Sequence, residues 1–77
     1  MLSYEECKKI AEERARNYNA TLVKAYRIRN DFVFEAEGNW AGVFPVVLFA
    51  ETGDTMGLWL YLNKYDLMMD DTVEIPL

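Results

Sequence analysis

The chain has 77 residues, of which 52% are hydrophobic, and it carries a formal net charge of −5 at pH 7. This length predicts a single domain spanning residues 1–77, and the hydrophobic content excludes an intrinsically disordered chain. Eight basic against thirteen acidic residues argue against nucleic-acid binding, which needs a clustered basic surface. The acidic balance keeps a protein soluble or steers it toward a basic protein partner.

The single cysteine and the hydropathy of the sequence indicate the cellular compartment in which the protein is expected. Cys7 is the only cysteine, which rules out an intramolecular disulfide and is typical of a reducing environment. The first residues lack the pattern of a signal peptide, and no apolar run reaches the roughly 18 residues of a membrane span. We therefore expect a cytoplasmic protein that does not enter a membrane.

The first segment has the pattern of an amphipathic helix that begins after Ser3. Ser3 and Glu6 have the spacing of a capping box, in which each side chain accepts a hydrogen bond from the other residue's backbone N–H. We expect the helix to end at Asn17 or Asn19, because asparagine tolerates the left-handed conformation that often terminates a helix. The i, i+3, i+4, i+7 spacing predicts one buried stripe, made of Cys7, Ile10, Ala11, Arg14, Ala15 and Tyr18.

Strands are predicted after this helix. They cover residues 22–28, 32–37, 43–51 and 56–62, where alternating or continuous apolar residues occur. Asn30-Asp31 is expected to form the first turn, the glycine-bounded segment 38–42 a loop, and Thr52-Gly53-Asp54 the last turn.

The last residues are expected to continue with less regular structure. Residues 63–71 are interpreted as one or two helical turns with Asn63 as a cap, and 72–75 as a short strand that ends before Pro76. One helix followed by antiparallel strands predicts an α+β fold. In it the N-terminal helix packs on a four-stranded antiparallel sheet, with a short C-terminal helical turn or extended tail.

The strands 43–51 and 56–62 are apolar on both faces, although a strand with one wet face alternates apolar and polar residues. One helix covers only one face of the sheet. The other face is predicted to carry Val33, Val47, Phe49, Trp59 and Tyr61, a patch larger than monomers usually expose. Three covers remain open: the tail through Leu67, Met68 or Met69, a second copy of the chain, or a bound protein or small ligand.

The candidate partner or ligand surface therefore consists of Val47, Phe49, Trp59, Tyr61 and the loop residue Trp40. Tryptophan is enriched among residues that dominate interface energetics, so both tryptophans are expected anchors for a protein partner. The alternatives are a small apolar ligand held between Phe49, Trp59 and Tyr61, or a structural homodimer.

Catalysis finds little support among the residue types. The chain has no histidine, which removes histidine-based acid/base chemistry and metal ligation. Cys7 has no histidine to activate it, and its place on the predicted stripe favours a core role. The glycines fit neither the dinucleotide-binding nor the P-loop pattern, and the acidic residues lack the calcium-loop spacing. We expect a non-enzymatic protein without cofactor or metal.

The motifs follow one another as a helix of the form S-Y-E-E-C-x-x-I-A, a strand, F-V-F, a glycine-bounded loop and P-V-V-L-F-A-E-T-G-D-T-M. This order, over most of residues 3–56, resembles small bacterial α-β-β-β domains. Two such groups are the immunity proteins of polymorphic toxin systems and the PepSY-type domains associated with peptidase propeptides. The more apolar third strand and the aromatic residues 58–62 depart from both patterns. The resemblance implies a binding or inhibitory role rather than catalysis.

Overall fold

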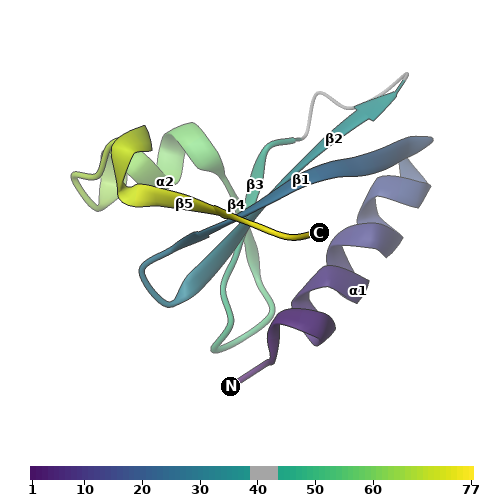
Figure 1. The fold of residues 1–77 in the computed structure, drawn as a ribbon, viewed down its shortest axis with the longest axis horizontal. Helices are drawn as coiled ribbons and strands as arrows, with labels where there is room; N and C mark the ends of the chain where they lie inside the picture. The colour runs from purple at the N-terminus through teal and green to yellow at the C-terminus, as the bar shows by residue number, and fades with distance from the viewer. Residues whose placement is uncertain (39–43) are drawn as a thin grey trace.

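The fold is a twisted antiparallel sheet with a helix packed on each face (Figure 1). The structure, a computed structural model, describes residues 1–38 and 44–77. In chain order its elements are α1 (Tyr4–Asn17), β1 (Ala20–Ile28), β2 (Asp31–Gly38), β3 (Val46–Leu48), β4 (Thr55–Gly57), α2 (Leu58–Lys64), the 3-10 turn η2 (Met69–Asp71) and β5 (Thr72–Ile75). Within the described residues the sheet has five strands in the order β4-β3-β2-β1-β5. The predicted α+β class is confirmed, but the sheet has one strand more than the four predicted.

Helix α1 begins and ends as the sequence predicts. The Ser3 hydroxyl accepts from the Glu6 backbone N–H at 3.2 Å, and the Ser3 N–H donates to the Glu6 carboxylate at 2.9 Å, which confirms the capping box. The helix ends at Asn17, and Asn19 takes the left-handed conformation with a φ of 55° as the chain turns into β1. The side of α1 that faces the sheet is made of small buried residues, namely Cys7, Ala11 and Ala15.

The β1–β2 hairpin turns one residue earlier than predicted. Ile28 pairs with Asp31, so the two turn residues are Arg29 and Asn30. Asp31 is the first residue of β2, and its carboxylate accepts hydrogen bonds from the β3–β4 loop and from α2. A register shift between Leu22 and Lys24 interrupts the pairing, and it explains why the apolar residues of this strand change parity.

The prediction for residues 56–62 is wrong beyond Gly57. Strand β4 is only three residues long, and α2 begins directly after it, with the Leu58 N–H donating to the Pro45 carbonyl at 3.1 Å. Helix α2 buries Leu58, Tyr61 and Leu62, which have helical spacing, and directs the residues between them outward. The third strand is also shorter than the predicted 43–51, because β3 covers three residues before the chain turns.

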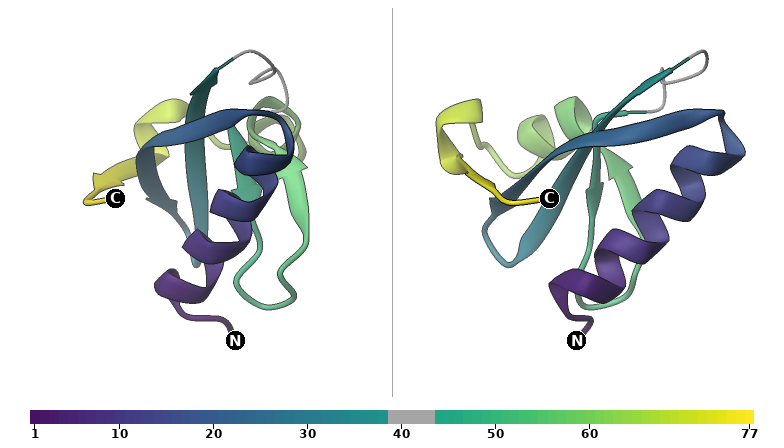
Figure 2. Two further views of the ribbon diagram at one scale, coloured as in Figure 1. Left: turned by 90° about the vertical axis from the view of Figure 1, so that its right-hand side faces the viewer. Right: turned by 45° about the vertical axis from the view of Figure 1, so that its right-hand side comes forward.

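In the C-terminal tail, the structure differs from the prediction at Asn63 and agrees with it at residues 72–75. Asn63 lies inside α2, so the prediction that it caps a later helix is wrong. The expected strand at the end of the chain is confirmed as β5, which pairs with the second half of β1 from Ala25↔Ile75 to Ile28↔Thr72. Figure 2 shows α1 and α2 on opposite sides of the sheet, with β5 along its edge.

Two hydrophobic clusters lie on the two faces of the sheet. The inner cluster, between α1 and the sheet, comprises Cys7, Ala11, Ala15, Leu22, Ala25, Phe34, Leu48 and Ala50. The outer cluster, between α2 and the sheet, comprises Ile28, Val33, Val47, Leu58, Tyr61 and Leu62. The Tyr4 ring closes one end of the inner cluster, 5.2 Å from Phe32 and 6.0 Å from Phe34 between ring centroids.

Candidate functional site

The outer face of the sheet is covered by the chain itself. Val47 and Tyr61, two members of the predicted partner surface, have no exposed area and belong to the outer cluster. The tail alternative is right about an intramolecular cover but wrong about most of its residues, since α2 provides it. Leu67 packs against the outer cluster, whereas Met68 and Met69 are exposed.

A hydrogen-bonded carboxylate fixes α2 to the strands below it. The Tyr61 hydroxyl donates to Asp31 Oδ2 at 2.7 Å, and the Ala50 N–H donates to Asp31 Oδ1 at 3.2 Å. Burial, and then the hydrogen bond to Asp31, raise the pKa of Tyr61 to about 12. The phenol is therefore neutral at physiological pH, as a buried donor to a carboxylate should be. This arrangement holds structure together and presents no reactive group.

Aromatic rings continue from Tyr61 to the surface. Phe49 lies 5.6 Å and Tyr65 4.8 Å from the Tyr61 ring, and the Arg29 guanidinium lies 4.5 Å from the Tyr65 ring centroid. Phe49 and Tyr65 separate two hollows of about 230 and 580 Å³. Both hollows are bordered by basic and acidic residues, including Arg29, Glu51, Asp54 and Lys64. This mixture of charges does not favour a ligand of one particular chemical class.

Trp59 is the one described residue of the predicted surface with a largely exposed side chain. It is 64% exposed, and Leu60 beside it is 60% exposed, because both lie on the side of α2 that faces away from the sheet. Trp59 does not join Phe49 and Tyr61, so the predicted three-ring ligand site does not form. Trp40 lies outside the described residues.

Sequence reasoning missed Leu60, because a strand from 56 to 62 places it on the buried side. The signal that identifies it is the helical spacing of Leu58, Tyr61 and Leu62, which leaves positions 59 and 60 on the opposite side. We call the exposed pair Trp59 and Leu60 the α2 knob.

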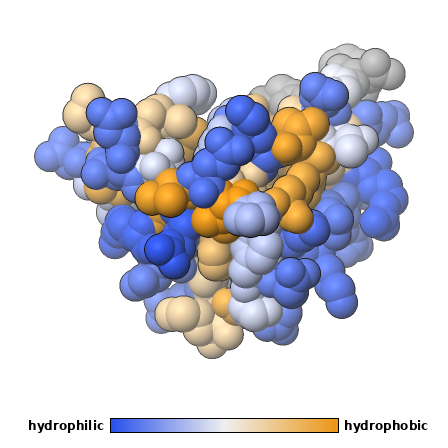
Figure 3. All heavy atoms as spheres, viewed as in Figure 1, coloured by the Kyte–Doolittle hydropathy of each residue, from blue (hydrophilic) through white to orange (hydrophobic). Residues whose placement is uncertain are grey.

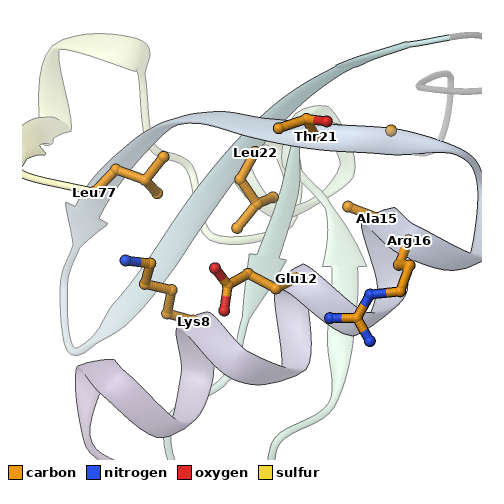
Figure 4. Close-up of a pocket in the computed structure, with 8 residues that line it drawn as sticks. Lys8, Glu12, Ala15, Arg16, Thr21, Leu22 and Leu77 are labelled. Atoms are coloured by element: carbon orange, nitrogen blue, oxygen red, sulfur yellow. The ribbon is translucent and has the colours of Figure 1, made fainter.

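A second surface feature, which the sequence did not indicate, is a groove of about 450 Å³ between α1 and β1 (Figure 4). Lys8, Glu12 and Arg16 line it from the helix, and Leu77 lies at one end. Ala15, Ala20, Thr21 and Leu22 complete its lining. Figure 3 shows strongly apolar residues across the middle of this side of the molecule, where β5 and β1 lie, with hydrophilic residues on either side. Val23 of β1, Val73 of β5 and Leu77 at the end of the chain are exposed apolar residues.

The thiol and the carboxylates form no recognisable reactive centre. Cys7 is buried in the inner cluster, and burial raises the pKa of its thiol, which disfavours the nucleophilic thiolate. Across residues 1–38 and 44–77, no three Cys, Asp or Glu side chains are grouped as a metal site would require. In the same residues no helix is long and apolar enough to cross a membrane.

Comparisons of the chain with protein-family models, with curated proteins and with solved structures find no match. The α2 knob and the groove between α1 and β1 are therefore interpreted from their own geometry.

Proposed function

We propose that the protein is a non-enzymatic binding module that docks onto another protein through the α2 knob. The observation that carries the proposal is the contrast within α2. One side of the helix closes the outer cluster completely, while Trp59 and Leu60 stay more than half exposed on the other. An indole at the centre of an interface is the side chain most often found to dominate binding.

The acidic balance of the chain and of the segment after α2 favours a basic partner. The segment that follows α2 carries Asp66, Asp70 and Asp71 on exposed positions, and the chain as a whole has a net charge of −5. Asp71 is held in place because its carboxylate accepts the Met68 N–H at 2.8 Å. Complementary charge accelerates association and selects the partner, while the apolar knob supplies most of the affinity. An immunity-like inhibitor of a basic partner protein in the cytoplasm is the form of this function that we favour.

Truncation of the indole tests the proposal. Trp59→Ala should leave the far-UV circular dichroism spectrum unchanged, because the side chain is not part of the outer cluster. Affinity capture followed by mass spectrometry identifies the partner, whose dissociation constant is then measured with purified proteins. We expect Trp59→Ala to weaken binding by roughly 30-fold, the effect of a loss of about 2 kcal/mol at a hot spot.

Tyr18→Ala is the matched control, since Tyr18 is an exposed aromatic residue at the far end of α1. Equal affinities of wild type and Trp59→Ala for the identified partner would contradict the proposal. If sedimentation of the purified chain instead gives a dimer that Trp59→Ala dissociates, the knob binds a second copy, and the homodimer replaces the partner protein.

A further inference from the structure

Among residues 1–38 and 44–77, no strand pairs with the outer edge of the first half of β1. Strand β1 runs from Ala20 to Ile28, but β5 pairs only with Ala25–Ile28. The other edge of β1 is paired with β2 along its whole length, except at Val23, which has no partner in the register. Residues 20–24 therefore present backbone N–H and C=O groups at the sheet edge, in line with β5. Figure 1 shows that the chain ends where this free edge begins.

The groove lies directly beside this edge. Leu22 and Ala15, which are almost completely buried, form the floor of the groove, and Leu77 contributes exposed apolar surface at the end next to β5. The Tyr4 hydroxyl donates to the Pro76 carbonyl at 2.9 Å and fixes the position of that end.

The helical side of the groove has a regular charge pattern. Lys8, Glu12 and Arg16 are spaced four residues apart, which places them along one side of α1 at intervals of about 6 Å. Side chains on one face of an extended strand repeat at about 6.6 Å. Three successive side chains on one face of an added strand could therefore lie beside these three residues of α1. Two of the three are cationic in a chain with a net charge of −5, which favours carboxylates on the added strand.

We propose that this groove binds an extended acidic peptide segment of a partner, which adds to the free edge of β1 at residues 20–24. Main-chain hydrogen bonds to the edge provide the alignment, as in other cases of strand addition. An apolar side chain of the segment lies over Leu22 and Ala15. Carboxylates two residues to either side of it lie beside Lys8 and Arg16. The site is separate from the α2 knob, so it does not depend on the proposed function.

A second copy of the chain fits this edge less well than an acidic peptide. Pairing β1 with β1 of another copy would bring together two edges that each carry Lys24, with Lys8 and Arg16 close by. Like charges placed opposite one another destabilise strand pairing.

The test is a titration of the isotope-labelled protein with a capped peptide of sequence Glu-Thr-Leu-Thr-Glu, followed by amide chemical shifts. We expect saturable shifts in the amides of residues 20–24. The peptide Lys-Thr-Leu-Thr-Lys should bind at least tenfold more weakly, a difference of about 1.4 kcal/mol. Binding of the acidic peptide should weaken as salt is added, because the paired charges are close to solvent.

Two variants locate the binding charges. Lys8→Glu combined with Arg16→Glu should weaken the acidic peptide at least tenfold, whereas Lys9→Glu combined with Lys64→Glu changes the net charge equally and should leave it unchanged. Trp59→Ala should also bind the peptide normally. Absence of saturable shifts, equal binding of the two peptides, or shifts at residues 20–24 that depend on protein concentration alone would each overturn the proposal.

Discussion

Asp31 shows how one residue connects three parts of the chain. Asp31 is the first residue of β2. Its carboxylate accepts one hydrogen bond from the Ala50 N–H in the β3–β4 loop and another from the Tyr61 hydroxyl of α2. A half-buried carboxylate with both oxygens hydrogen-bonded is stable in this position, whereas removal of one donor leaves an unsatisfied charge. Because α2 rests on this contact, its strength affects whether the outer cluster stays closed.

We predict that this contact makes stability depend on alkaline pH. The pKa of Tyr61 is about 12 in the folded protein against an ordinary value of 10, so the folded state retains the proton longer than the unfolded state. The stabilisation from the neutral phenol is thus fully present below pH 10 and is lost as the pH rises toward 12. Urea unfolding at a series of pH values measures this loss.

Tyr61→Phe provides the comparison. It should lower the free energy of unfolding at pH 7 by about 1–3 kcal/mol, because Asp31 loses a donor, and its stability should fall less steeply above pH 10. Some slope remains, since burial also raises the pKa of Tyr4 and Tyr26. Parallel pH profiles for wild type and Tyr61→Phe would show that the phenol does not contribute.

At the scale of elements, α2 is the cover that the apolar hairpin requires. Leu58 is fully buried in the outer cluster, whereas Leu60, two residues later, projects into solvent. We predict that Leu58→Ala lowers the free energy of unfolding by about 2–5 kcal/mol, the usual effect of a cavity in a core. Leu60→Ala removes the same atoms from the surface and should change it by less than about 0.5 kcal/mol. Denaturant unfolding separates the two, and similar values for both would contradict this position of α2.

The sequence predicts α1 and β5 well, because capping residues, periodicity and a following proline define them locally. It fails at residues 58–62, where Leu-Trp-Leu-Tyr-Leu contains no polar residue to mark a wet face. Such a run fits a strand buried on both sides and a short helix equally well. Tertiary contacts determine that this segment is a helix, because a helix buries Leu58 and Tyr61 against the face of the sheet that α1 leaves open.

The same reasons determine how much of the candidate site was predictable. Trp59 could be named from its residue type and from the excess of apolar residues around it. The groove could not, because it results from the unequal lengths of β1 and β5 and from the position of α1 beside them. The lengths of paired strands depend on contacts between segments distant in the sequence, so they cannot be predicted from a local sequence pattern.

At the scale of the whole molecule, the two clusters share one sheet. Residues on adjacent positions of β2, such as Val33 and Phe34, belong to the outer and the inner cluster respectively. Loss of either cluster should therefore destabilise the other. We predict a single unfolding transition with a heat-capacity change of about 1 kcal/mol/K for a chain of 77 residues. Coincident circular dichroism and tryptophan fluorescence curves would support this, and separate transitions for the two signals would contradict it.

The single cysteine gives the protein an internal reporter of its own opening. The Cys7 thiol lies fully buried under α1, and burial raises its pKa, so a thiol reagent in solution reaches it only when α1 leaves the sheet. Because no other cysteine competes for the reagent, the rate of alkylation of the native chain measures how often that separation occurs. Opening of α1 can therefore be followed on the natural sequence, without introducing a labelling site by mutation.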